Sequence, residues 1–229
     1  MLYWVEFKPL STADTVEAFK RNQIEEAIAL LSGEDGRKHG AALRTRIKRL
    51  LDTDRNLGRK PRSKDAEENR YAFYSEEAPG KGVEIWFTPY EAFAVHLGLR
   101  LLAHGWPQTF VVSVLRRERT ALEDQHHRIL AQDAATLFDE KALLQNAQAG
   151  ALAFDNIDPV FLVVVSPTMS IHDDLRQLST AVCRGVEQIA RFQKQTKAIS
   201  TSFFELVGPA HALHRALSRS KPRKRGRGA

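Results

Sequence analysis

The sequence predicts an α+β fold that is mostly helical, with a winged-helix-like region first, then a long helix and a small C-terminal α/β region. Three observations lead to this fold class. Apolar residues recur at helical spacing through most of the first 131 positions, two aromatic runs with period-two character interrupt them, and residues 160–165 are continuously apolar. A hydrophobic content of 43% in 229 residues is sufficient for a buried core.

The first elements are expected to be a short strand and two amphipathic helices. Residues 3–7 resemble a strand, and residues 12–31 show helical periodicity that ends in a Gly-containing turn at 32–36. A second helix is expected at 39–53, since Leu43, Ile47 and Leu50 lie on one helical face.

Two aromatic runs, residues 70–74 and 83–87, predict a β-hairpin. They are rich in aromatic and β-branched residues, and the segment between them contains Pro79, Gly80 and Gly82. A helix is then expected from Thr88 to about His104. Thr88 is suited to the N-cap, Pro89 to the first helical position and Glu91 to a capping box, and Gly105 ends the helix.

Residues 107–131 are expected to form one long helix. Along it Val111, Leu115, Leu122 and Ile129 recur at intervals of four, seven and seven. This seam has two interpretations, packing within the chain or a homodimer through residues 107–131.

The last third has the order of a small α/β region. A strand is expected at 160–165, a helix at 171–197 with Cys183 in its middle, a strand-like segment at 202–207 and a last helix at 209–217. We therefore divide the chain into residues 1–104, a connector at 105–148, a C-terminal region at 149–218 and a disordered basic tail at 219–229.

Positive charge is concentrated in two segments. Residues 37–64 contain eleven basic residues against two aspartates, a net charge of +9, and residues 219–227 contain six basic residues and no acid, a net charge of +6. Because the whole chain carries +6, the remainder carries −9. A mildly acidic body with two cationic surfaces is typical of a protein that binds a polyanion, and duplex DNA is the partner we predict.

The candidate DNA-binding residues lie on the second helix, on the loop after it and on the hairpin. The helix would dock in the groove, the loop would hold phosphates, and Arg70 with Tyr71 would seat the hairpin as a wing. The predicted contacts are Arg44, Arg46, Lys48, Arg49, Arg59, Lys60, Arg62, Lys64, Arg70 and Tyr71. In the tail, the predicted phosphate contacts are Arg223, Lys224, Arg225 and Arg227.

The order of a basic helix, an aromatic hairpin and two further helices resembles the MerR-like winged-helix regulators over residues 24–130. The matching pieces are Ala42-Leu43-Arg44, Asn69-Arg70-Tyr71, Tyr74-Ser75-Glu76-Glu77 and Leu102-Ala103-His104-Gly105. The resemblance implies a winged helix-turn-helix that binds DNA and a dimerisation helix. The chain departs from the family in its longer basic loop at 55–64 and in its shifted wing aromatics.

Other functions are less well supported by the residues. The sequence has no nucleotide-binding glycine loop, nucleophile elbow or clustered carboxylates, so we expect no enzyme, no cofactor and no metal. His211 and His214 are three residues apart but lack a third ligand, which favours packing. A lone cysteine, no signal peptide and no membrane span predict a cytoplasmic protein. The alternatives are a protein-interaction adaptor with incidental basic surfaces, and an RNA-binding or hydrolytic protein.

Overall fold

The computed structural model describes residues 17–33, 40–80, 83–146, 154–167 and 175–221. Its helices are α1 (Arg21–Leu31), α2 (Gly40–Leu57), α3 (Ala66–Asn69), α4 (Pro89–Ala103), α5 (Gln108–Arg117), α6 (Arg119–Ala131), α7 (Ala134–Leu137), α8 (Glu140–Asn146), the 3-10 turn η1 (Leu175–Gln177), α9 (Gly185–Thr196) and α10 (Val207–Arg219). Its strands are β1 (Phe19–Lys20), β2 (Trp86–Phe87), β3 (Val160–Ser166), β4 (Ser179–Arg184) and β5 (Ser200–Glu205). The predicted fold class, α+β and mostly helical, is confirmed.

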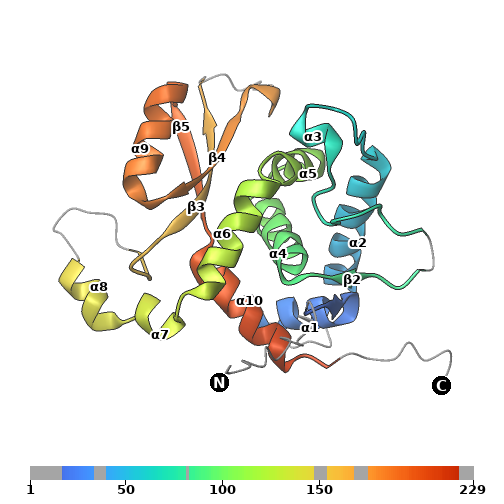
Figure 1. Ribbon diagram of the computed structural model, residues 1–229, viewed down its shortest axis with the longest axis horizontal. Coiled ribbons are helices and arrows are strands. Elements are labelled where there is room, and N and C mark those ends of the chain that lie inside the picture. The colour runs from blue at the N-terminus through green and yellow to red at the C-terminus, as the bar shows by residue number, and fades with distance from the viewer. Residues whose placement is uncertain (1–16, 34–39, 81–82, 147–153, 168–174, 222–229) are drawn as a thin grey trace, which may run out of the picture.

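Helices form the larger part of the fold, and a three-stranded antiparallel sheet lies beside them (Figure 1). The sheet has the order β4-β3-β5, with β3 in the centre. Val160, Leu162 and Val164 of β3 face the helical core, whereas Phe161 and Val163 face a second apolar cluster with Ile189 of α9. The two alternating faces explain why the predicted strand at 160–165 is apolar throughout.

The N-terminal elements differ from the prediction in where they begin. Helix α1 begins at Arg21, because Phe19 and Lys20 are extended and pair with Phe87 and Trp86 of β2. Residues 12–16 of the predicted helix lie outside the described residues. The predicted strand at 3–7 lies outside the described residues. Helix α2 confirms the predicted second helix and extends it to Leu57.

The predicted hairpin is wrong. Residues 70–74 form no strand, and β2 pairs with β1 instead. Tyr71, Phe73 and Tyr74 are buried in the main core, so their aromatic character reflects packing of an irregular segment and not a wing.

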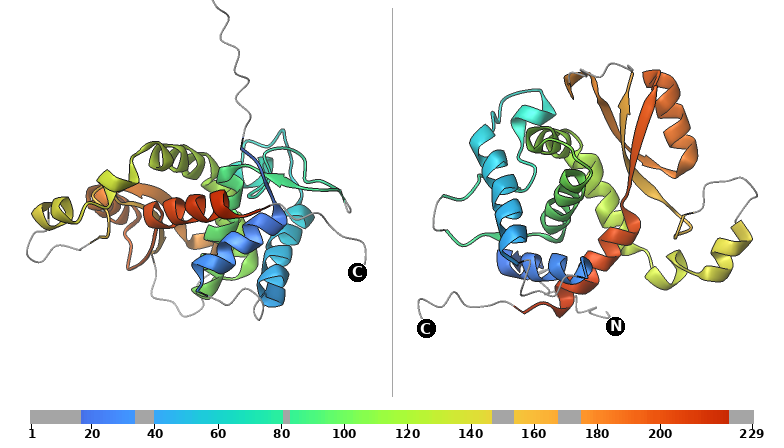
Figure 2. Two further views of the ribbon diagram at one scale, coloured as in Figure 1. Left: turned by 90° about the horizontal axis from the view of Figure 1, so that it is seen from below. Right: turned by 180° about the vertical axis from the view of Figure 1, so that it is seen from behind.

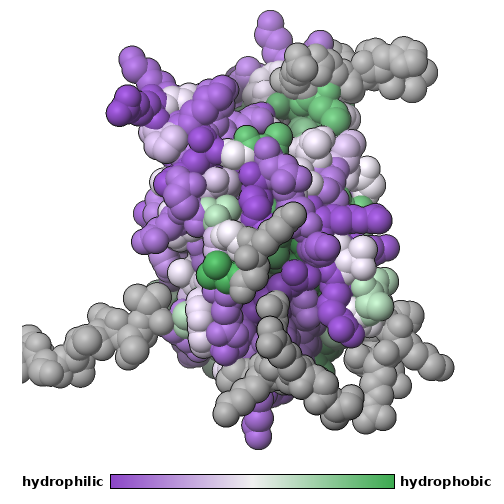
Figure 3. Space-filling model, turned by 90° about the vertical axis from the view of Figure 1, so that its right-hand side faces the viewer, coloured by the Kyte–Doolittle hydropathy of each residue, from purple (hydrophilic) through white to green (hydrophobic). Residues whose placement is uncertain are grey.

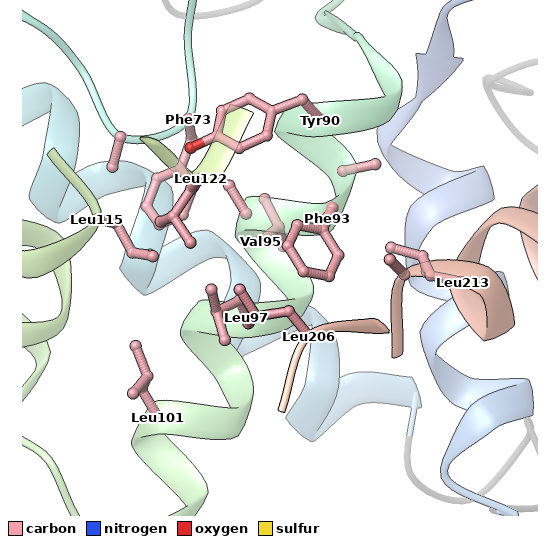
Figure 4. Packing of buried hydrophobic residues seen from close by; sticks show 14 of the residues in the cluster. Phe73, Tyr90, Phe93, Val95, Leu97, Leu101, Leu115, Leu122, Leu206 and Leu213 are labelled. Carbon is pink, nitrogen blue, oxygen red and sulfur yellow. The ribbon is translucent and has the colours of Figure 1, made fainter. Parts of the chain in front are cut away.

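Helix α4 runs through the middle of the helical core. Its capping box is present, with Thr88 Oγ1 accepting from the Glu91 amide at 3.2 Å and Glu91 Oε2 accepting from the Thr88 amide at 2.8 Å. Figure 4 shows Phe93, Val95 and Leu97 of this helix among side chains from other elements, including Leu213 of α10.

The predicted long helix is broken at Glu118 into α5 and α6. The four seam residues Val111, Leu115, Leu122 and Ile129 are at most 1% exposed. The homodimer predicted through residues 107–131 cannot form through this seam, because the seam packs inside its own chain.

The C-terminal region also needs correction. Of the predicted helix at 171–197, the described residues form the turn η1, the strand β4 and the shorter helix α9. Cys183 is a buried residue of β4 opposite Phe161 of β3. Helix α10 crosses back and packs against α1, as the views in Figure 2 also show. One core thus joins residues from all three predicted regions, and the boundaries near 104 and 149 do not separate independent cores.

Within the described ranges, no helix is both long enough and apolar enough to cross a membrane.

Candidate nucleic-acid interface

Helix α2 presents its cationic side to solvent. Ile47, Leu50 and Leu51 point into the core and are at most 2% exposed. The four predicted docking residues on this helix, Arg44, Arg46, Lys48 and Arg49, are all exposed. Figure 3 views the molecule from the α2 side of Figure 1, and hydrophilic residues cover most of this face.

The four cations lie along two flanks of the exposed side of α2. Arg44 and Lys48 are four residues apart and share one flank, whereas Arg46 and Arg49 are three residues apart and share the other. Among the described residues none of the four forms an ion pair; Arg44 Nε donates to the Gly40 carbonyl at 2.9 Å. Residues 40–51 contain these four basic residues and no acid, so the local charge is +4.

The loop after α2 is much less cationic than the prediction assumed. Arg59 pairs with Glu77 at 2.7 Å and Lys60 pairs with Glu68 at 2.8 Å. The Lys60 hydrogen bond raises the pKa of Lys60 and lowers that of Glu68. Residues 55–80 contain six basic and five acidic side chains, a net charge of only +1.

Arg62 and Lys64 differ from their neighbours in this loop. Both are exposed and have no carboxylate partner in the described part of the chain. They extend the available positive charge beyond α2.

The two predicted wing residues are not free. Tyr71 is 6% exposed and its hydroxyl donates to Glu77 at 3.2 Å. Arg70 hydrogen-bonds to Asn69 Oδ1 at 3.0 Å and to the Thr120 hydroxyl. The predicted role of these two residues in a wing is therefore wrong. Both side chains hold the irregular segment against its neighbours.

A buried ion pair, which the sequence reasoning missed, anchors this segment to the core. Arg116 Nε donates to Asp54 Oδ1 at 2.6 Å, and both side chains are at most 4% exposed. Asp54 Oδ2 accepts from the amides of Ala72 and Phe73 at 2.9 and 3.1 Å. Burial raises the pKa of Asp54, and the Arg116 charge opposes that rise.

Arg119 completes the anchor one helical turn away. Its Nη1 donates to the carbonyls of Tyr71, Ala72 and Tyr74 at 2.9 to 3.1 Å. Its Nη2 lies 3.7 Å from Glu91 at the start of α4. The spacing in the sequence could have indicated both buried charges. Asp54 lies on the apolar face of α2, and Arg119 follows the buried Leu115 by four residues, which places it on the same helical face.

The remaining predicted features are the tail and the paired histidines. The tail residues Arg223, Lys224, Arg225 and Arg227 lie outside the described residues. His211 packs edge-on against Phe138 with ring centroids 5.8 Å apart. Across the described ranges, no three His, Cys, Asp or Glu side chains are placed to hold a metal ion.

Comparison with protein-family models, with curated proteins and with solved structures finds no match. The functional argument therefore depends on the chemistry of α2 and its surroundings.

Proposed function

We propose that this chain binds duplex DNA through the exposed side of α2 and acts as a DNA-binding regulator in the cytoplasm. The observation that carries the proposal is the set of four exposed cations on α2, which has no acid among residues 40–51 and no ion-pair partner among the described residues.

The shape of α2 fits this proposal. An 18-residue helix is about 27 Å long, and its diameter of about 10–12 Å matches the width of the major groove. With α2 along that groove, the two cationic flanks face opposite phosphate backbones. Arg46 and Arg49 also have the planar donor geometry that reads guanine edges.

The proposal changes the roles of the remaining predicted residues. Arg62 and Lys64 add phosphate contacts, and the basic tail adds further contacts of the same kind. Arg59, Lys60, Arg70 and Tyr71 are left out, because binding through them would break existing ion pairs or hydrogen bonds or expose a buried ring.

The test is a salt titration of DNA affinity with two matched variants. In the first, Arg44, Arg46, Lys48 and Arg49 are changed to Gln. In the control, four exposed cations on other helices are changed to Gln, which removes the same total charge. These are Arg128, Arg191, Lys194 and Arg215.

The α2 variant should lose most of its duplex affinity, and the slope of log K against log salt should fall by about 3 to 4, since each lost phosphate contact lowers it by about 0.9. The control should change the slope by less than about 1. Equal losses in both variants would mean that only net charge matters. Tighter binding to RNA would favour the RNA-binding alternative, and no binding to any nucleic acid would favour the adaptor.

A further inference from the structure

A pocket of about 300 Å³ lies between α1, α2 and α4. Its apolar walls include Ile28 of α1, Leu43 of α2 and Leu99 of α4. Its polar lining includes Arg46, His96 and Arg100, and none of the described lining residues is Asp or Glu. The pocket thus combines apolar and cationic side chains in its lining.

The two guanidinium groups retain capacity for an anion. Arg46 is exposed and has no ion-pair partner in the described ranges. Arg100 Nη1 donates to the Glu205 backbone carbonyl at 2.7 Å, which uses one of its five N–H groups and provides no formal negative charge. Burial lowers the pKa of Arg100, and the charge of Glu205 partly opposes that change.

His96 supplies a third polar group. Its Nδ1 is buried and has no hydrogen-bond partner among the described residues. Burial, and next the charge of Arg100, lower the pKa of His96 to about 4, so the ring is neutral at pH 7. The neutral His96 ring therefore lines the pocket without adding a charge of its own.

We propose that this pocket binds a small organic carboxylate, with its apolar part against Ile28, Leu43 and Leu99. The carboxylate accepts charged hydrogen bonds from Arg46 and Arg100, beside the neutral ring of His96. Such convergence of a few polar groups in an otherwise apolar cleft is typical of small-molecule sites.

The size and lining of the pocket define the ligand class. A volume near 300 Å³ is at the lower end for ligand pockets and excludes a nucleotide-sized molecule. An inorganic anion would leave the apolar walls unfilled, and an uncharged apolar molecule would leave both guanidinium groups unpaired. An aromatic or branched aliphatic monocarboxylate satisfies both parts.

The test uses the full chain without nucleic acid, so its outcome does not depend on the proposed DNA binding. Benzoate is the probe, benzamide its uncharged counterpart and inorganic phosphate the anion without an apolar part. Binding is followed by calorimetry and by the NMR shifts of the His96 ring. Benzoate should bind with a dissociation constant on the order of 1 mM and shift the His96 resonances.

Benzamide and phosphate should bind at least about tenfold more weakly, because benzamide has no negative charge and phosphate has no apolar part. Arg46→Gln should weaken benzoate binding by about tenfold, since it removes a charged hydrogen bond from an exposed residue that the fold does not need. Arg49→Gln on the same helix lies outside the pocket lining and should leave the affinity unchanged.

Three results would overturn the proposal. These are no detectable benzoate binding, equal binding of benzoate and benzamide, or equal effects of Arg46→Gln and Arg49→Gln. Ala103→Phe provides a second check, because Ala103 is an exposed lining residue and a larger ring there should block benzoate while the circular dichroism spectrum stays unchanged.

Discussion

Removing one partner from the buried pair of Asp54 and Arg116 should strongly destabilise the fold, which Arg116→Met tests. The substitution removes a 2.6 Å ion pair whose partners are at most 4% exposed. It also removes hydrogen bonds from Arg116 to the carbonyls of Gly58 and Glu67. Breaking a buried pair by removing one partner costs about 3–5 kcal/mol, a large share of the 5–15 kcal/mol typical of a folded protein.

The assay is urea unfolding at pH 7, followed by circular dichroism, for a double-mutant cycle with Asp54→Asn. The asparagine has no charge but can still accept from the Ala72 amide. We expect the double variant to be about 2 kcal/mol more stable than the sum of the single losses predicts. The cost of Arg116→Met should also shrink between pH 7 and pH 5. Without the arginine, the pKa of Asp54 rises further above its unfolded value, and proton uptake then stabilises the folded variant.

A cost below about 1 kcal/mol for Arg116→Met, or strict additivity in the cycle, would refute this reasoning. Either result would mean that the segment around Ala72 is held by the Arg119 hydrogen bonds and apolar packing, without a contribution from the ion pair.

Three further predictions concern the core and the pocket. Burial, followed by the charge of neighbouring histidines, lowers the pKa of His126 to about 3. Because the folded protein holds the His126 ring neutral, the linked stability is fully present above the pKa of the unfolded chain, near 6.5, and is lost as the pH falls toward 3. Unfolding free energy should therefore drop by about 3 kcal/mol by pH 4.5. His126→Phe should remove that part of the drop in a urea series, and an unchanged profile would contradict it. Leu115→Glu combined with Leu122→Glu should unfold the chain and remove the helical bands from its circular dichroism spectrum, because both side chains are at most 1% exposed; a folded variant would contradict the burial of the seam. Saturating benzoate should weaken duplex DNA binding by about fivefold in the unmodified protein but not in Arg46→Gln, since Arg46 belongs to both proposed sites; an equal effect in both proteins would disprove the shared role.

Local signals in the sequence were sufficient for several elements. The apolar face of α2, the capping box of α4 and the uninterrupted run of β3 predicted these elements close to their observed bounds. Each of these signals comes from neighbouring residues, so no tertiary information was needed.

The elements that were mispredicted depend on distant partners. Residues 70–74 have the composition of a strand, but the amides of Ala72 and Phe73 donate to Asp54, which lies 18 and 19 residues earlier. Val182 and Cys183 lie in a strand because β3 provides hydrogen bonds to β4. Period and composition alone did not distinguish these arrangements from a hairpin and a helix.

The same limit applies to the candidate site. The exposure of Arg44, Lys48 and their two neighbours followed from helical periodicity. The ion pair between Arg59 and Glu77 joins residues 18 positions apart and could not be inferred from spacing. The pocket at His96 requires three helices to meet, which the sequence does not reveal.

Photo-crosslinking from the outer side of α2 tests most directly whether this helix contacts DNA. Thr45 is an exposed residue among the four cations, and Gln195 is an exposed residue of α9. In a Cys183→Ser background, which removes the buried native thiol, a single cysteine at either position carries the same photoactivatable label. We predict crosslinks to duplex DNA from position 45 that disappear in high salt, and none from position 195. Equal crosslinking from both positions, or crosslinking from position 195 alone, would contradict the assignment of α2 as the DNA-binding element.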